Sequence, residues 1–231
     1  MADKREDELA LGEKINVFMN KYRKAILIGF IGIVIALSSL IVTTIVRDRM
    51  QSSALTRLDA LMQTYNDVLT FMRSDTITVM ELATNAELFD LLDELTDFGN
   101  RNSGFAAGRA FTMKAEIYWE MGNWEEAETA WLQAARSTSR SYLAPISFFN
   151  AGVAAEELGK FDTAIAHYSS ALTYGDQFPG AARAQFSIGR LEESRNNRDA
   201  ALAAYRNLVN TWPEDPVWPD LAQSRIIVLT E

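Results

Sequence analysis

The side chains that could perform acid–base or nucleophilic chemistry are few in this 231-residue sequence. It contains one histidine, His167 in the stretch AIAHYSSA, and no cysteine. Histidine is the usual general base near neutral pH, but it needs a nucleophile and an orienting group within hydrogen-bond reach. Because the sequence indicates no such partners, we expect His167 to be a packed or surface residue of a helix rather than a catalytic base.

Two pairs of adjacent carboxylates could suggest a general acid and base, Glu125-Glu126 and Glu156-Glu157. Neighbouring residues on a helix project about 100° apart, so the members of each pair do not face one another, and we interpret them as solvated charges. Nucleotide-binding glycine motifs and the HExxH zinc motif are absent from the sequence. Without cysteines, disulfides and thiolate metal sites are excluded. We therefore expect a protein that is not an enzyme and has no cofactor or metal.

The charge of the chain excludes another class of function. Residues 47–231 contain 16 basic and 26 acidic side chains, a net charge of −10. Nucleic-acid binding requires cations that face the phosphates, so this balance argues against it. The same charge argues against residues 47–231 lying flat on an anionic lipid surface.

One segment of 22 residues, Ala25–Val46, contains no charged side chain. A helix of that length is about 33 Å long, which is enough to cross the hydrocarbon core of a bilayer. The run is longer than the core of a signal peptide, no clear A-x-A cleavage site follows it, and it lacks the polar face of a surface helix. We expect an uncleaved transmembrane helix at residues 25–46.

The orientation of this helix depends on a weak difference in flanking charge. Lys14, Lys21, Arg23 and Lys24 precede the apolar run, and three arginines follow it within a short distance. Because cytoplasmic flanks carry more Lys and Arg, we expect residues 1–24 to be a short cytoplasmic segment and the rest to lie on the opposite side.

Residues 47–103 are expected to form a pair of helices. The apolar residues of 51–73 follow alternating spacings of three and four, and this stripe comprises Leu55, Leu58, Met62, Tyr65, Leu69 and Met72. The stripe fits an ordinary helix packed on its neighbour or a short dimerising coiled coil. A second helix is expected at 76–98, where an acidic run is either a solvated face or a docking patch, and a loop at 99–104.

The rest of the chain repeats with a period of 37 residues. Small residues, alanines, aromatics and turn residues each recur at that interval: Ala115, Gly152 and Gly189; Ala127, Ala164 and Ala201; Trp131, Tyr168 and Tyr205; Gly122, Gly159 and Asn196. Gly and Asn tolerate left-handed backbone angles, so each unit is expected to be a helix, a tight turn and a second helix. The small residues would allow close helix approach, and the aromatics would fill the space towards the next unit. Units of this kind bury their apolar faces by stacking.

The stretches AEIYWEMGNWEEAETAWLQA, GVAAEELGKFDTAIAHYSSA and GRLEESRNNRDAALAAYRNL resemble the tetratricopeptide repeat. Three units cover about residues 107–215, and 217–230 are expected to form a solvating cap, so that 104–231 is the repeat domain. The resemblance implies an all-α fold, an α-solenoid of stacked helical hairpins. Together with the apolar segment, the architecture is similar to bacterial single-span repeat proteins of the inner membrane, such as the ancillary subunit of the Sec translocon. That similarity implies a periplasmic repeat domain and partners among the translocon, periplasmic chaperones or unfolded polypeptides.

The family resemblance also implies a binding groove on the first helix of each unit. The groove-facing residues would be Arg109, Thr112, Glu116, Trp119, Phe149, Val153, Glu156, Phe186, Arg190 and Glu193. Such a floor, apolar with mixed charges, would suit an extended or helical peptide. Residues 51–98 could instead fill this groove. We expect a membrane-anchored scaffold that binds protein partners; the alternative is a structural protein of the cell envelope that forms a homodimer through residues 51–73.

Overall fold

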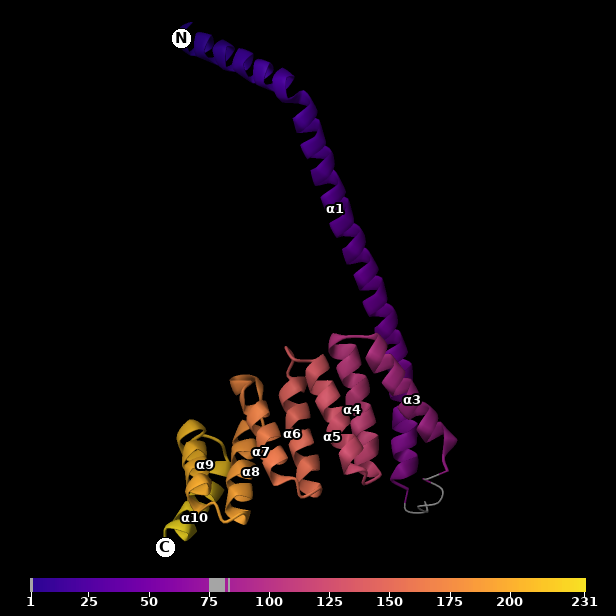
Figure 1. Ribbon diagram of the computed structural model, residues 1–231, viewed down its shortest axis with the longest axis vertical. Helices are drawn as coiled ribbons and strands as arrows, with labels where there is room; N and C mark the ends of the chain where they lie inside the picture. Colours follow the sequence, from indigo (N-terminus) through magenta and orange to yellow (C-terminus); the bar gives the residue numbers. More distant parts are fainter. Residues whose placement is uncertain (1, 75–81, 83) are drawn as a thin grey trace. The chain divides into compact units, whose positions relative to one another are not determined.

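The computed structural model describes the backbone of residues 2–74, 82 and 84–231 and the side chains of 21–24, 27–28, 30–43, 53–74, 82 and 84–231. All regular structure in these residues is helical (Figure 1). The chain divides into two compact units, Met1–Ser53 and Ala54–Glu231, which are described separately. The expectation of an all-α fold is therefore confirmed for the described residues.

The first unit is the N-terminal part of helix α1 (Ala2–Met72). The described side chains between residues 27 and 43 are exposed, including Ile28 and Phe30. Of the predicted span 25–46, the side chains of 25, 26, 29 and 44–46 lie outside the described residues. Among the residues that are described, none of the helices combines the length and the apolar composition needed to traverse a bilayer.

The second unit is a stack of helical hairpins. It contains the end of α1, then α3 (Ala86–Arg101), α4 (Gly104–Glu120), α5 (Trp124–Ser137), α6 (Leu143–Glu157), α7 (Phe161–Leu172), the 3-10 helix η1 (Gly175–Gln177), α8 (Ala181–Ser194), α9 (Arg198–Thr211) and α10 (Trp218–Thr230). From α3 to α10, each α-helix packs on the next, and first helices also meet, α4 with α6 and α8 with α10 (Figure 1). This is the predicted solenoid.

The turn inside each hairpin has the same backbone geometry. Gly122, Gly159 and Asn196 have φ values of 73°, 67° and 60°, in the left-handed region. The amide of the residue that follows each of them donates to a carbonyl five residues earlier, as in Asn123 N to Tyr118 O at 2.9 Å. This hydrogen bond closes the end of the first helix, and it confirms the turns predicted from the 37-residue period.

The alanines of the repeat lie at the junction of the two helices in each hairpin. Ala127, Ala164 and Ala201 are completely buried, and Tyr168 and Tyr205 are almost completely buried beside them. The links between hairpins, at 138–142 and 173–180, are longer than the turns inside the hairpins. Tyr168 also shares a hydrophobic core with Ala181 and Ala184 of α8, as predicted for an aromatic residue that fills the space towards the next unit.

The end of α1 packs against α3 and α4 in one hydrophobic core. The buried members of the predicted stripe, Leu58, Tyr65 and Leu69, contact leucines of α3 and apolar residues of α4 in this core. The stripe therefore follows the ordinary-helix interpretation, and a homodimer through it would require these side chains to leave the core. Leu55 is an exception, with 44% of its surface exposed.

One prediction about the ends of elements is wrong. The loop expected at 99–104 is mostly helical, because α3 continues to Arg101 and α4 begins at Gly104. Gly99 is needed for close packing rather than for a turn: a Cβ there would come within 2.5 Å of the Phe111 ring. The last helix, α10, forms where a capping helix was expected, and it exposes Leu221, Ile227 and Val228.

Candidate binding groove

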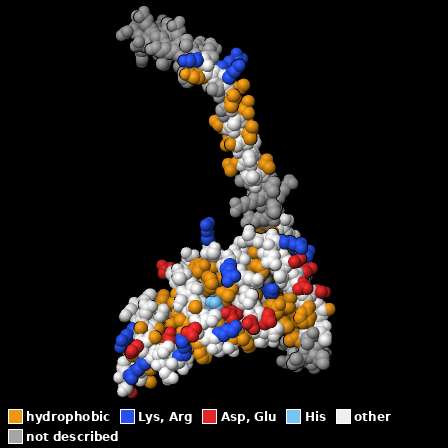
Figure 2. Space-filling model, in the orientation of Figure 1, with side chains coloured by type: hydrophobic (Ala, Val, Ile, Leu, Met, Phe, Trp, Pro, Cys, Tyr) orange, Lys and Arg blue, Asp and Glu red, His pale blue; other side chains and the backbone are white. Residues whose placement is uncertain are grey.

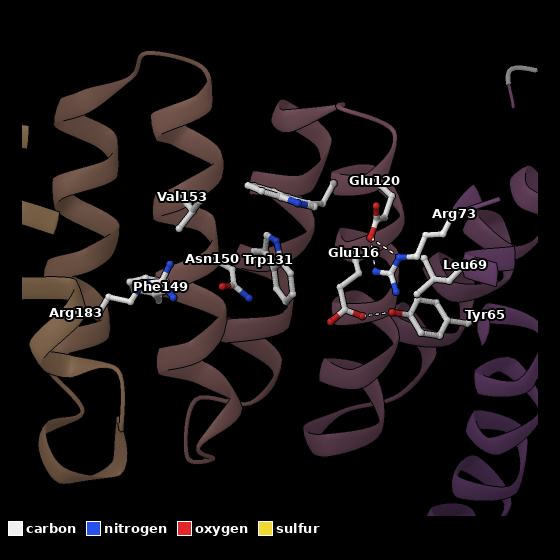
Figure 3. A pocket seen from close by; sticks show the side chains of 11 residues that line it. Tyr65, Leu69, Arg73, Glu116, Glu120, Trp131, Phe149, Asn150, Val153 and Arg183 are labelled. Atoms are coloured by element: carbon white, nitrogen blue, oxygen red, sulfur yellow. Dashed lines mark hydrogen bonds and ion pairs between the residues drawn. The ribbon is translucent and has the colours of Figure 1, made fainter. Parts of the chain in front are cut away.

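A pocket of about 470 Å³ opens between the first helices of the first two repeats. Its walls come from the end of α1, from α4, α5, α6 and α8, and Figure 3 shows the side chains that line it. They are Tyr65, Leu69, Arg73, Glu116, Trp119, Glu120, Trp131, Phe149, Asn150, Val153 and Arg183. A cavity of this size is within the range of ligand sites in proteins.

The wall formed by α1 and α4 is held together by polar contacts. The Tyr65 hydroxyl donates to the Glu116 carboxylate, and the Arg73 guanidinium donates to Glu120 with its Nε atom at 3.0 Å (Figure 3). Burial raises the pKa of the Tyr65 hydroxyl above its usual range, and the hydrogen bond to Glu116 adds to the shift. These contacts use the carboxylates of the wall within the chain itself.

The same contacts answer whether the N-terminal helices fill the groove. The N-terminal helices cover the part of the groove at α4, because Arg109 Nη2 lies 3.8 Å from Met62 Sδ and the Tyr65 hydroxyl contacts Glu116. The part beside α6 remains hollow. The groove is therefore closed at α4 by the end of α1 and open between α4 and α6.

The floor of the pocket is apolar and aromatic. Trp119 is half-buried and packs on Trp124, with ring centroids 4.6 Å apart. Trp131 is 5% exposed, and its indole N–H has no hydrogen-bond partner among the described residues. Phe149 and the half-buried Val153 complete this surface from α6.

The wall on the α8 side carries a positive charge. The guanidinium carbon of Arg183 lies 4.9 Å from the centroid of the Phe149 ring, a cation–π contact. Phe149 itself is buried and packs against Tyr168, with ring centroids 5.2 Å apart. Arg183 is exposed and forms no ion pair with any carboxylate that the structure describes.

A recurring three-residue contact, here called the polar triad, crosses the groove in the second and third repeats. In the second, the hydroxyl of Tyr168 and the guanidinium of Arg190 both donate to the carboxylate of Glu156. In the third, Tyr205 donates to Glu193 at 3.0 Å, and Arg225 Nε donates to the same carboxylate at 3.1 Å. Each triad ties a tyrosine of a second helix to a first helix and to the first helix that follows.

The triads shift the ionisation of their members. The hydrogen bond from Arg225 is the main cause that lowers the pKa of Glu193 below its usual value of 4.5. Burial, followed by the hydrogen bonds to Glu156 and Glu193, raises the pKa of Tyr168 and of Tyr205 above the usual tyrosine range. In the triad of the third repeat, Glu193 is therefore an ionised carboxylate and Tyr205 a neutral phenol at neutral pH.

The ten residues predicted for the groove divide into several groups in the structure. The first pocket includes Glu116, Trp119, Phe149 and Val153, and a second hollow of about 380 Å³ includes Phe186, Arg190 and Glu193. Glu156 lies between them as part of a triad.

The remaining two predicted residues are less accessible. Thr112 is 6% exposed, so it lies beneath the surface, and Arg109 is half-buried beside Met62 of α1.

Sequence reasoning missed several residues that line the pocket. Tyr65, Leu69 and Arg73 come from outside the repeat, so its period could not place them. Asn150 and Arg183 could have been found from helical spacing, because each lies three positions before a predicted groove residue, Val153 and Phe186.

His167 has a carboxylate partner that the sequence did not indicate. Its Nε2 lies 2.9 Å from Glu128 Oε1, between α7 and α5, and both side chains are largely buried. Lys160 Nζ lies 3.6 Å from the same carboxylate. Among the described residues, no group of three or more His, Asp or Glu side chains has the arrangement of a metal site. His167 therefore takes part in a contact between two repeats.

A comparison with protein families agrees with the repeated helical hairpins. A family model described as tetratricopeptide repeat matches residues 112–180 and 149–216. The chain is 37% identical over 127 residues to a TPR repeat-containing protein of Treponema pallidum (strain Nichols). The matched region covers 55% of this chain and 52% of that relative, so the chain spans about half of the relative's length. The solved structure of the MamA RS-1 ArsTM double mutant has a TM-score of 0.44 and 11% identity, covering 66% of this chain and 84% of that one.

Proposed function

We propose that this chain, whose residues 112–180 and 149–216 match the tetratricopeptide repeat model, is a scaffold or accessory protein that binds a segment of a partner protein in the groove between its first helices. The observation that carries the proposal is the pocket of about 470 Å³ between α4 and α6, with an aromatic floor and polar walls. Binding sites of proteins are typically concave and mostly apolar, with a small number of polar groups that fix orientation.

The charged groups along the groove favour binding over catalysis. Glu156 and Glu193 are each engaged by a tyrosine and an arginine, and Glu120 is engaged by Arg73. Carboxylates held in this way are already bound within the chain, whereas a general acid or base must be within hydrogen-bond reach of the substrate proton it transfers. We therefore propose a non-enzymatic role.

The first unit supports a proposal about location. Every described large hydrophobic side chain from Leu27 to Val42 is exposed, with exposed fractions between 45% and 70%, and Figure 2 shows these side chains along α1. A long series of exposed apolar residues is costly in water and stable in lipid. We propose that residues 25–46 anchor the chain in a bacterial inner membrane, with the N-terminus in the cytoplasm and the repeats in the periplasm.

Anchoring would assist a weak groove interaction. A tethered module meets a membrane-bound partner at a high effective concentration, so modest affinity is sufficient for occupancy. From the resemblance to single-span repeat proteins, we propose the Sec translocon or periplasmic folding factors as the candidate partners.

Site-specific crosslinking tests the proposed binding. A photoreactive amino acid is introduced at Val153 in the pocket and, as a matched control, at Ser169, which is exposed on α7. After irradiation of intact cells, adducts are purified and identified by mass spectrometry. We expect a defined protein adduct from position 153 that is absent from position 169. Equal labelling at both positions, or none at 153, would contradict the proposal.

Two further measurements test the location. Carbonate washing at alkaline pH should leave the full-length chain in the membrane pellet, whereas release into the supernatant would contradict anchoring. Protease added to sealed spheroplasts should degrade the repeats while sparing an N-terminal tag, and the opposite pattern would reverse the proposed orientation.

A further inference from the structure

The polar triad of the second and third repeats is replaced as a whole in the first repeat. Positions 37 residues before the members of the second repeat's triad carry different side chains: Trp131 for Tyr168, Trp119 for Glu156 and Val153 for Arg190. The phenol, the carboxylate and the guanidinium are exchanged together for two indoles and an isopropyl group. The first repeat therefore has neither the carboxylate nor the guanidinium of a triad at this level of the groove.

This exchange coincides with the pocket. Trp119, Trp131 and Val153 all line the cavity of about 470 Å³, where no ion pair links α4 to α6 among the described residues. In the second repeat, the same level of the groove is crossed by the ion pair between Glu156 and Arg190. In the first repeat, Trp119, Trp131 and Val153 therefore line an apolar part of the pocket, here called the recess. In the second repeat, an ion pair occupies the equivalent place.

The carboxylates beside the recess have partners within the chain, whereas the arginine on the opposite wall is in no described ion pair. Tyr65 and Arg73 engage the two carboxylates of the α4 wall, Glu116 and Glu120. Arg183 lies on the opposite wall over the Phe149 ring and is in no ion pair with a described residue. The recess therefore combines an aromatic floor with one positive charge that no described carboxylate balances.

We propose that this recess is the specificity pocket of the groove, and that it binds an extended segment of the partner protein through one bulky apolar side chain and one nearby carboxylate. The aromatic or branched aliphatic side chain packs on Trp119, Trp131 and Phe149, and the carboxylate pairs with Arg183. The burial of one large apolar side chain in a desolvated pocket is the usual source of a binding hot spot. Arginine binds a carboxylate through two parallel hydrogen bonds, which fixes the direction of the segment. This inference rests on the proposed function and names the partner chemistry for that same site.

Short fluorescent peptides test the apolar side chain and the carboxylate separately. The parent series is rich in Gly and Ser, has a central Phe, and has a Glu at successive positions on either side; binding to the full-length protein in mild detergent is measured by fluorescence anisotropy. We expect at least one Glu position to bind, and replacing its Phe by Ala to weaken binding about tenfold or more. Replacing Glu by Lys should weaken the same peptide. Binding that is indifferent to both changes, or absent for every parent peptide, would overturn the inference.

A triple variant tests the structural cause. Trp119→Glu, Trp131→Tyr and Val153→Arg together place the residues of the second repeat's triad at the equivalent positions of the first repeat. We expect this variant to retain a cooperative melting transition. Its affinity for the peptide should fall about tenfold or more. Unchanged affinity in the folded triple variant would overturn the inference.

A charge exchange provides a second test that does not depend on folding of the triple variant. Arg183→Glu should lose affinity for the Glu peptide and gain affinity for its Lys counterpart. Arg206→Ala, an exposed arginine on α9, is the matched control and should change neither affinity. Absence of the exchange in preference would contradict the role of Arg183.

The crosslinking and peptide experiments together distinguish failure of this inference from failure of the proposed function. If crosslinking from position 153 captures a defined protein but the peptides show no Phe or Glu dependence, the groove binds partners by other chemistry. If no protein is captured at 153, the proposed function itself fails.

Discussion

Gly152 lies directly against the ring of Tyr168: a Cβ atom built on Gly152 would be 2.6 Å from Tyr168 Cε1 and 2.8 Å from Cδ1. The same relationship recurs one repeat later, where a Cβ on Gly189 would be 2.6 Å from Tyr205 Cε1. Distances below 3.0 Å are not compatible with a real Cβ, so the first helix can approach the aromatic ring only with glycine at this position. Each ring is also held at its hydroxyl by the carboxylate of the triad.

Replacement of Gly152 by alanine is expected to destabilise the protein. The gain in helix propensity is about 1 kcal/mol, whereas overpacking against a ring that is fixed at both ends typically costs about 1–3 kcal/mol. Thermal or urea unfolding of the full-length protein measures the net loss. Ser169→Ala, on the exposed side of α7, is the control and should leave the transition within experimental error. A more stable Gly152→Ala protein would show that the ring can move away.

The alanine at the junction of a hairpin gives a second prediction. Ala164 is completely buried between α7 and its neighbours, beside Tyr168 and Ala155. Ala164→Leu adds several carbon atoms to a filled space and is expected to destabilise by about 1–3 kcal/mol. Ala166→Leu, two positions away and exposed, should have little effect. An unchanged midpoint for Ala164→Leu would contradict the packing described.

The parts of the fold that follow the period were predictable for a physical reason. A glycine or asparagine in a left-handed turn, an alanine at the helix junction and an aromatic residue between units satisfy requirements that recur identically in each hairpin. Gly159 and Asn196 therefore occupy equivalent turns although their side chains differ. The loop expected at 99–104 fails for the complementary reason: Gly99 meets a packing requirement against Phe111 that composition alone cannot distinguish from a turn.

The binding site was only partly predictable because it depends on departures from the period. The resemblance placed Trp119, Phe149 and Val153 in the groove, and the structure brings them together in one pocket. Its other wall comes from the end of α1 and the residue after it, and Tyr65 and Arg73 have no counterpart in the repeat. The period could have revealed that Trp119 and Trp131 replace a glutamate and a tyrosine, but the contact between those residues becomes visible only in the structure.

Two neighbouring tryptophans are expected to differ in their roles. Trp119 is half-buried in the floor of the pocket, so Trp119→Ala should weaken peptide or partner binding about tenfold while the melting transition changes little. Trp131 is 5% exposed and packs in the core with Ala115 and Ala151, so Trp131→Ala should destabilise by about 3–5 kcal/mol. Anisotropy and urea unfolding on the same preparations separate the two effects. A large loss of stability in Trp119→Ala would instead identify it as a core residue.

The triad at the end of the solenoid predicts a dependence of stability on acid. Glu193 has a pKa below its usual value of 4.5, chiefly because Arg225 donates hydrogen bonds to it, and Tyr205 also donates to it. A carboxyl group whose pKa is lower in the folded state stabilises the fold at pH values above its unfolded pKa, and this contribution is lost as the pH falls through the folded pKa. The free energy of unfolding, measured with urea between pH 7 and pH 3, should therefore fall less steeply for Glu193→Gln than for the natural protein, because the variant has already lost this contribution at pH 7. Glu214→Gln, exposed in the link before α10, is the control and should follow the natural curve. Parallel curves for Glu193→Gln and the natural protein would show that the ion pair with Arg225 contributes nothing to stability in solution.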